Sequence, residues 1–479
     1  MPKRRADATA GEDDEMRASE EKDNLPELPP ADEEWSADED DVEEEPDEEE
    51  SGEDDEEGME EGEPAVQEPS RVYLPGEAEE AEKTGDLVCD ESAYQLYHTC
   101  GTLLPCLSFD VIPDNLGDER TTYPATVYCI AGSQAEKANK NSLLIMKMSK
   151  LSQMKPQKDS DDEDEDSGDD SDEDELPELE CAQIRHIGAV NRLKFAKVNN
   201  VPLAASFSET GSVHLWDLTN AIRAVDDSRI MSNFRQNASD YTPFYTFSGH
   251  KAEGFALHWS RAAPGQLATG DCNGDIHVWK PISGGRWNVD QRSYRSHTSS
   301  VEDIQWSPNE ANVFASCSSD KSIKIWDIRQ NPISACMMTT GDAHTEDVNV
   351  IHWNPTEPFI VSGSDAGDIK VWDLRRFATG NAAVAVFRHH RGPICSIEWH
   401  PTDSTVFAAA GEDNQLTQWD IAVEKGEDEP QELDSVPPQL LFIHQGQTEI
   451  KELHWHPQMP GVILSSALNG IDVFKTISV

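Results

Sequence analysis

A repeating pattern of aromatic residues constrains this chain more than any other feature of its sequence. Short hydrophobic runs end in an aromatic residue followed by Asp or Lys, and each lies 28–30 residues after a histidine. In the central part of the chain these aromatic residues are 46 or 47 residues apart. A fixed period indicates one small unit that is repeated and must stack on its neighbours to bury its faces. The aromatic residues are Trp216, Trp279, Trp326, Trp372, Trp419 and Phe474, and the histidines are His186, His250, His297, His344, His390 and His444.

The pattern resembles the WD40 repeat, which starts near Gly-His and ends at Trp-Asp. Gly249 and His250 match the start, and Trp326 and Asp327 match the end. The resemblance implies an all-β fold, a seven-bladed WD40 β-propeller over residues 105–479, with four strands in each blade. Six repeats are visible, and the hydrophobic runs at 126–131 and 142–148 would supply a seventh blade. We expect that blade to share strands with 471–477, and we expect insertions near 219–243 and 423–438.

Acidic residues are concentrated in two parts of the chain. Residues 1–70 hold 32 acidic and 5 basic residues, and residues 159–180 hold 15 acidic residues and no basic residue. Residues 1–70 have almost no large apolar side chains, so we expect a disordered acidic tail. An acidic loop at 152–181 is expected to interrupt the propeller.

Composition also excludes several classes of function. A net charge of −56 gives no basic patch for direct binding of nucleic acid or an anionic membrane surface. No apolar run approaches the ~20 residues of a membrane span. The nine cysteines form no Cys-x-x-Cys pair, so neither a zinc site nor a disulfide framework is indicated. We also find no phosphate-binding loop and no His-Glu-x-x-His motif, and we therefore expect no enzyme, metal or cofactor.

Residues 71–104 are expected to form an N-terminal partner-binding segment. We expect a helix from 91 to 99, because apolar residues recur there at helical spacing, and Asp90 or Ser92 can cap it. The residues expected on the partner-binding helix are Ala93, Tyr94, Leu96 and Tyr97.

One repeat carries a His, Ser, Asp and Trp that could be mistaken for a hydrolase triad. These residues are His297, Ser316 (or Ser318), Asp320 and Trp326. A nucleophile would be unique, whereas these residue types recur in several repeats, so we interpret them as a structural tetrad between strands. Asp413 matches the Asp of the tetrad, whereas Thr210 and Asn273 do not, and we expect those two repeats to be less well fastened.

The acidic loop is the candidate binding site. A tethered polyanion attracts basic proteins by Coulomb attraction and counterion release, in competition with nucleic acid. The sequence therefore predicts a chaperone for a basic client, and phosphorylation by acidophilic kinases would add negative charge. The client-binding candidates are Asp161, Asp162, Glu163, Asp164, Glu165, Asp166, Asp169, Asp170, Asp172, Glu173, Asp174 and Glu175, and the phosphorylation candidates are Ser36, Ser51, Ser160, Ser167 and Ser171.

Three stretches carry a closer family resemblance, at residues 87–94, 105–110 and 114–124. With the Glu-rich N-terminus and the repeats, they resemble the glutamate-rich WD-repeat proteins of eukaryotes, which are related to the retinoblastoma-associated histone-binding WD40 proteins. The resemblance implies a nuclear and nucleolar chaperone that carries the third large-subunit ribosomal protein into the assembling ribosome. It equally implies binding of core histones near replication origins, and the sequence does not separate the two clients.

A third class of function stays open on two short motifs. Residues 325–329 and 371–375 resemble the Trp-Asp-x-Arg box of substrate receptors that bind the adaptor of a cullin ubiquitin ligase. The hypothesis assigns adaptor binding to Arg329 and Arg375. A scaffold that binds partners through the propeller alone is the remaining alternative.

Overall fold

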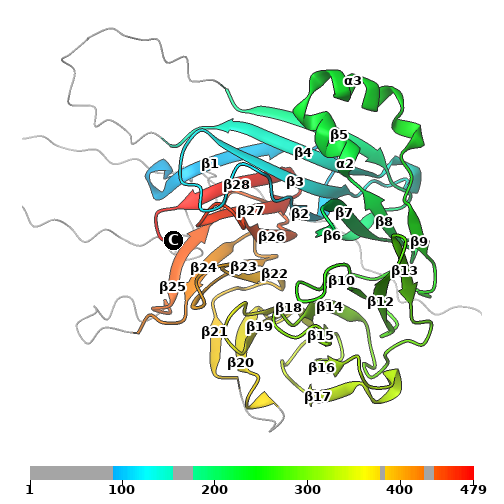
Figure 1. Ribbon diagram of the computed structural model, residues 1–479. Helices are drawn as coiled ribbons and strands as arrows, with labels where there is room; N and C mark the ends of the chain where they lie inside the picture. The colour runs from blue at the N-terminus through cyan, green and yellow to red at the C-terminus, as the bar shows by residue number, and fades with distance from the viewer. Residues whose placement is uncertain (1–89, 155–175, 378–382, 425–435) are drawn as a thin grey trace, which may run out of the picture. The chain divides into compact units, whose positions relative to one another are not determined.

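The computed structural model describes residues 90–154, 176–377, 383–424 and 436–479 (Figure 1). The expected tail at 1–70, the client-binding candidates 161–175 and the five phosphorylation candidates lie outside the described residues. In the described parts, seven four-stranded antiparallel sheets form a seven-bladed β-propeller, so the fold class expected from the sequence is confirmed.

We number the blades by the order of their innermost strands along the chain. Within a blade, the chain runs from the innermost strand outwards, and blades 1 to 3 consist of the following strands: β2 (Cys106–Val111), β3 (Ala125–Ser133), β4 (Ser142–Leu151) and β5 (Glu178–Arg185); β6 (Val190–Val198), β7 (Val201–Ser208), β8 (Val213–Asp217) and β9 (Tyr245–Phe247); β10 (Ala256–Trp259), β11 (Leu267–Gly270), β12 (Ile276–Ile282) and β13 (Arg286–Val289).

Blades 4 to 6 repeat this order, and their strands are as follows: β14 (Val301–Trp306), β15 (Val313–Ser318), β16 (Ile323–Asp327) and β17 (Cys336–Thr340); β18 (Val348–Trp353), β19 (Phe359–Ser364), β20 (Asp368–Asp373) and β21 (Ala385–Arg388); β22 (Ile394–Trp399), β23 (Val406–Gly411), β24 (Leu416–Asp420) and β25 (Leu440–His444).

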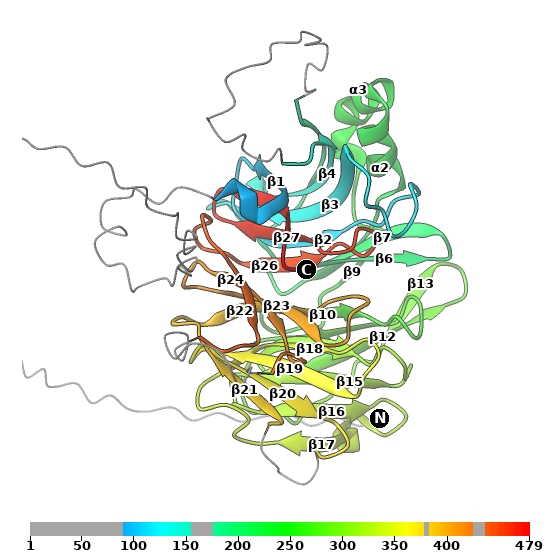
Figure 2. The ribbon, with the colours of Figure 1, turned by 90° about the vertical axis from the view of Figure 1, so that its left-hand side faces the viewer.

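Blade 7 closes the ring with strands from both ends of the described chain. It contains β26 (Glu452–Trp455), β27 (Val462–Ala467), β28 (Gly470–Thr476) and, as its outermost strand, β1 (Tyr94–Gly101). β1 pairs antiparallel with β28, from Tyr94 opposite Thr476 to Gly101 opposite Gly470. Figure 1 labels the two strands side by side, and in Figure 2 the blue β1 lies beside the red C-terminal strands. The expectation that blade 1 shares strands with 471–477 is therefore wrong, because β2–β5 form a complete blade.

The helix expected at 91–99 is also wrong. Only Glu91–Ala93 form a short 3-10 helix, η1, whose N-terminus is capped by Asp90 through a 3.0 Å bond from the amide of Ser92. From Tyr94 the chain is extended, and Leu96 is fully buried. The apolar residues at helical spacing were misleading because β28 offers an edge that pairs with the whole segment, and this pairing outweighs a weak local helical preference.

The expected insertion near 219–243 contains two amphipathic helices, α2 (Thr219–Asp226) and α3 (Ser228–Gln236), followed by the 3-10 turn η3 (Ala238–Asp240). Their apolar residues pack with side chains of β4 and β5 in one buried cluster. Two more 3-10 turns are η2 (Ala138–Lys140) and η4 (Pro332–Ser334). None of the helices in the described residues is long and apolar enough to cross a membrane.

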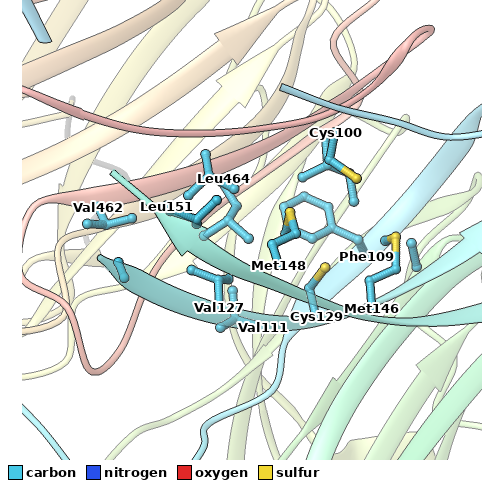
Figure 3. Close-up of a cluster of buried hydrophobic side chains, with 14 of the residues drawn as sticks. Cys100, Phe109, Val111, Val127, Cys129, Met146, Met148, Leu151, Val462 and Leu464 are labelled. Carbon is cyan, nitrogen blue, oxygen red and sulfur yellow. The ribbon is translucent and has the colours of Figure 1, made fainter. Parts of the chain in front are cut away.

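The hydrophobic core lies between adjacent blades. Between blades 7 and 1, Phe109, Cys129 and Met146 pack with Cys100 of β1 and Leu464 of β27 (Figure 3). This arrangement explains the repeat in the sequence, because the face of each sheet is buried only by its neighbour. The eight cysteines among the described residues are all free thiols.

The four residues of the expected tetrad come together in blade 4. The Trp326 Nε1–H donates to Ser316 Oγ (2.8 Å), which lies 2.7 Å from His297 Nε2, and His297 Nδ1 lies 3.0 Å from the Asp320 carboxylate. Burial lowers the pKa of His297, so the ring is neutral and links Ser316 to Asp320.

Blades 3 and 2 lack the aspartate at the usual turn position, and another acceptor faces the histidine in each. In blade 3, His250 Nδ1 lies 3.1 Å from Asp271, which replaces the aspartate missing at Asn273. In blade 2, where Thr210 stands at the turn, His186 Nδ1 lies 2.9 Å from the carbonyl oxygen of Gly188. The expectation of a loosely fastened blade 3 is therefore wrong, because a hydrogen bond depends on position in space rather than on one position in the repeat.

Candidate protein-binding surface at one end of the propeller

The seven innermost strands run parallel and lie next to one another around the propeller axis (Figure 1), and their side chains line a small axial channel. Their direction follows from side chains that bridge neighbouring strands. The backbone N–H groups of Leu193 and Phe195 in β6 donate to Ser108 (2.9 Å) and Asp110 (2.6 Å) of β2. Because the strands are parallel, every blade turns from its first to its second strand, and from its third to its fourth, at the same end. We call this end the insertion face.

Alternate residues of the innermost strands point into the channel and form two levels. The first level lies nearer the insertion face and consists of Asp110, Lys194, His258, Gln305, His352, Glu398 and His454. The second level lies farther from that face and includes Arg192, Asp303, Val350, Ser396 and Glu452. They line a cavity of about 190 Å³. The sequence analysis missed them, although two signals could have revealed them: the spacing of two residues and, for six residues of the first level, a position just before Phe or Trp.

Glu452 is the centre of the charges in the channel. One oxygen lies 2.9 Å from Arg192 Nη1 and 2.7 Å from Lys194 Nζ, while the other accepts hydrogen bonds from Phe109 N (2.8 Å) and Ser108 Oγ (2.7 Å). Burial opposes its ionisation, but Lys194, Arg192 and His454 together hold the pKa of Glu452 well below its ordinary value. The carboxylate therefore joins blades 7, 1 and 2 at the point where the ring closes.

The histidines of the channel occupy different protonation states. Burial lowers the pKa of His258 to about 3 and that of His352 to about 4, and each ring accepts a hydrogen bond from a backbone N–H of the next blade. Burial also opposes protonation of His454, but Glu398 and Glu452 raise the pKa of His454 to about 9. Because these groups satisfy one another, the channel is a structural centre of the propeller.

The insertion face differs from the channel because acidic segments are joined to it. Residues 155–175 connect β4 to β5 in blade 1, and residues 425–435 connect β24 to β25 in blade 6. The second connection, which was expected as an insertion near 423–438 but not singled out as acidic, has six acidic residues and one basic residue over 424–435. Both blades are neighbours of blade 7, and the chain enters β1 through Asp90 at this same face. Acidic chain is therefore attached to three consecutive blades at one end.

The start of the acidic loop is held against β1. The carbonyl oxygen of Ser152 lies 2.8 Å from His98 Nε2, and Met154 N donates to the carbonyl oxygen of Gln95 (3.0 Å). After residues 155–175, the chain resumes at β5, where Glu178 pairs with Lys150 of β4 (2.8 Å). The expected boundaries of 152–181 are thus too wide, because β5 begins at Glu178 and residues 152–154 lie along β1.

The structure separates the four residues that were expected on a partner-binding helix. Leu96 is buried in the core, and Tyr94 is buried with its hydroxyl 2.8 Å from His444 Nδ1. Ala93 and Tyr97 are only partly buried and, like Met154, pack against the apolar cluster between blades 6 and 7. Only Ala93 and Tyr97 are therefore accessible to a partner.

The two motifs that resemble the Trp-Asp-x-Arg box have the same geometry. Arg329 forms a bidentate ion pair with Asp327, and Arg375 forms one with Asp373. Both guanidinium groups are about two-thirds exposed, at 63% and 66%. In the described parts of the chain, no group of three or more His, Cys, Asp or Glu side chains could hold a metal ion.

Comparison with known proteins places these features in a family. A family model described as the histone-binding protein RBBP4, or a component of the CAF1 complex, matches residues 85–152, which include β1 to β4. A model of the WD domain, G-beta repeat, matches residues 288–327, 335–373 and 381–420.

Three relatives are similar over most of their length. The chain is 42% identical to the ribosome assembly protein rrb1 of Schizosaccharomyces pombe over 435 residues, 88% of each chain. It is 41% identical to Protein HEAT STRESS TOLERANT DWD 1 of Arabidopsis thaliana, over 86% of this chain and 92% of the relative. It is 41% identical to the glutamate-rich WD repeat-containing protein 1 of Dictyostelium discoideum, over 85% of each chain. The chain therefore belongs to the family of WD40-repeat proteins that contains these ribosome assembly and glutamate-rich WD-repeat proteins.

Proposed function

We propose that this protein is a non-enzymatic chaperone for a basic client, a large-subunit ribosomal protein, and that it acts in ribosome assembly in the nucleus and nucleolus. The observation that carries the proposal is the attachment of acidic chain to blades 6, 7 and 1 at the insertion face. The name of the fission-yeast relative, a ribosome assembly protein, supports the process. The His-Ser-Asp-Trp residues recur in several blades, as structural residues do, whereas a catalytic nucleophile would be unique, and this recurrence supports a binding scaffold rather than an enzyme.

The physical basis is a high local concentration of negative charge. Residues 159–180 carry fifteen carboxylates, and the described ends of this loop are fixed along β1 and β5. A basic protein that binds there releases counterions, so its affinity falls as the salt concentration rises. Binding would also shield the basic surface of the client from nucleic acid until the client is incorporated.

The test compares two variants with the same net charge. The first replaces the twelve carboxylates between Asp161 and Glu175 with Asn and Gln, and the second replaces the twelve between Asp38 and Glu53. We measure the affinity for the third large-subunit ribosomal protein as a function of salt. The first variant should bind at least about tenfold more weakly near 0.1 M salt, with a flatter salt dependence. Equal losses in the two variants would mean that net charge alone drives binding, and would refute a site at the insertion face.

A histone is the second candidate client, and one observation favours it. The family model that matches residues 85–152 is described as a histone-binding protein. Affinity purification from nuclear extract at moderate salt, followed by mass spectrometry, separates the two clients. One stoichiometric large-subunit ribosomal protein without whole ribosomes would support the proposed client, whereas predominant core histones would assign the protein to chromatin. If the wild type recovered a cullin-ligase adaptor and R329A/R375A did not, the result would support a function as a substrate receptor of a cullin ubiquitin ligase.

A further inference from the structure

A cavity of about 500 Å³ lies between blades 1 and 2 at the insertion face. Ile112, Pro113, Leu116, Phe195, Pro202 and Ile222 give it an apolar lining. Such a volume is within the usual range of ligand sites, ~300–1,000 Å³. The cavity shares no residue with the apolar cluster between blades 6 and 7, and of the residues that line the axial channel it shares only Phe195.

Two insertions that the propeller does not need build this cavity. The connection from β2 to β3 has 13 residues (112–124), whereas the equivalent connections of the other six blades have two to seven. The opposite wall comes from α2, which belongs to the long connection between β8 and β9. Long additions to a repeated unit commonly carry function, because the fold itself is complete without them.

The connection from β2 to β3 is held in place before any partner binds. Gln458 Oε1 accepts a hydrogen bond from Asp114 N (2.8 Å), and Arg120 N donates to the backbone oxygen of Gln458 (3.0 Å). Arg120 also forms an ion pair with Asp114 at 2.8 Å. Leu116, between these fixed points, is 60% exposed at the cavity. A partner that contacts Leu116 would therefore not have to order the loop.

The charged groups of the cavity are largely neutralised within the protein. Asp226 accepts hydrogen bonds from Tyr128 Oη (2.7 Å) and Lys147 Nζ (2.9 Å), and Asp114 is paired with Arg120. Lys197, exposed at the edge, adds a positive charge that disfavours entry of a basic side chain. The cavity is therefore suited to a neutral apolar side chain, although it lies on a face with attached acidic chain.

We propose that this cavity binds one large apolar side chain of the basic client, from a segment whose neighbouring Lys and Arg residues contact the acidic loop. The proposal rests on the proposed function and adds an anchor that selects among basic proteins. Lys147, which lines the cavity, and the last residue of β4, Leu151, are four residues apart, or about 13 Å at ~3.3 Å per residue. The strand that lines the cavity is therefore the same strand that leads into the acidic connection.

The test uses L116D, because Leu116 is mostly exposed and its replacement leaves the core intact. The matched control is L468D, which adds the same charge at a half-exposed leucine in the β27–β28 turn, at the opposite end of the propeller. Attraction to the added charge alone would make L116D bind the basic client slightly more tightly. Loss of an apolar anchor should instead weaken binding about tenfold or more, with an unchanged salt dependence.

Poly-lysine, which has no apolar side chain, is the second probe. L116D and the wild type should bind it equally, and L468D should behave like the wild type with both probes. I222E, on the opposite wall, should reproduce the loss seen with L116D. Unchanged client affinity in both cavity variants would overturn the anchor, as would self-association of the free protein that L116D abolishes. Failure of the proposed function is distinguishable, since it would appear as client binding that is insensitive to neutralisation of 161–175.

Discussion

Replacement of Glu452 by glutamine tests how the ring is closed. Glu452 of blade 7 is 2% exposed and bonds to Arg192 and Lys194 of blade 2 and to backbone and side chain of blade 1. Glutamine has nearly the same shape and keeps one acceptor for Phe109 N. Its amide N–H₂ group, however, would face two cations, which are also hydrogen-bond donors. The substitution therefore removes one charge and the acceptor shared by Arg192 and Lys194, with little change in shape.

The expected loss of stability follows from the buried charges that stay behind. Removal of one partner of a buried ion pair typically costs about 3–5 kcal/mol, because the other charge is left without compensation. Here Asp303 still interacts with Arg192, and Asp110 with Lys194. We therefore expect a value near the lower limit, about 3 kcal/mol in the free energy of unfolding.

Urea denaturation followed by tryptophan fluorescence measures this loss, and E449Q is the control. Glu449 lies in the connection from β25 to β26, is 60% exposed and faces Lys451 at 3.7 Å. A surface pair of this kind contributes about 0–1 kcal/mol, so E449Q should unfold close to the wild type. If E452Q also unfolds within about 0.5 kcal/mol of the wild type, the channel charges do not stabilise ring closure and the reasoning is refuted.

Three further predictions concern pH, the tetrads and the outermost strand of blade 7. Burial holds the pKa of His258 at about 3 and that of His352 at about 4, below the ~6.5 of an unfolded chain. The unfolded state therefore binds more protons, and the urea midpoint should fall as the pH drops from 7 to 5, whereas a midpoint that rises would contradict neutral rings. Ser316→Ala leaves His297 Nε2 and Trp326 Nε1 without their partner and should lower the free energy of unfolding by about 2 kcal/mol. The control Ser334→Ala, at an exposed serine, should change it little, and equal stabilities of the two variants would show that the tetrad does not stabilise the blade. Gly470 has a φ of 146°, and Gly470→Ala would place a Cβ against the carbonyl oxygen of Cys100 in β1. The variant should therefore loosen β1 and make it a site of limited proteolysis, whereas an unchanged cleavage pattern would mean that β1 adapts.

The repeats made most of the architecture predictable. A blade buries its faces only against its neighbours, so the same residues must recur at the same spacing, and six recurrences leave few alternatives to a closed ring. The insertion at 219–243 was predictable for the same reason, because it interrupts a fixed period. The tetrad of His297 was predictable as well, since its four residues occupy regular positions of one repeat.

Segments without a repeat were predicted less well. The apolar residues of 93–100 fit a helix, and only the edge of β28, nearly 400 residues away, makes the segment a strand. The hydrogen bond from His250 to Asp271 could not be foreseen either. The regular position of the aspartate holds Asn273, and the sequence does not show that a carboxylate two residues earlier is close enough to His250 to replace it.

Six repeats and the distribution of charge could be read from the chain itself, because the spacing of buried residues and the composition are local properties, and the family resemblance added the seventh blade. Which distant residues meet became known only from the folded molecule. Folding brought Glu452 to Arg192 and Lys194, joined acidic connections from blades 1 and 6 to one face beside β1, and built the cavity between α2 and the β2–β3 connection. These contacts join residues far apart in the chain, and their geometry depends on how the ring closes rather than on any local pattern.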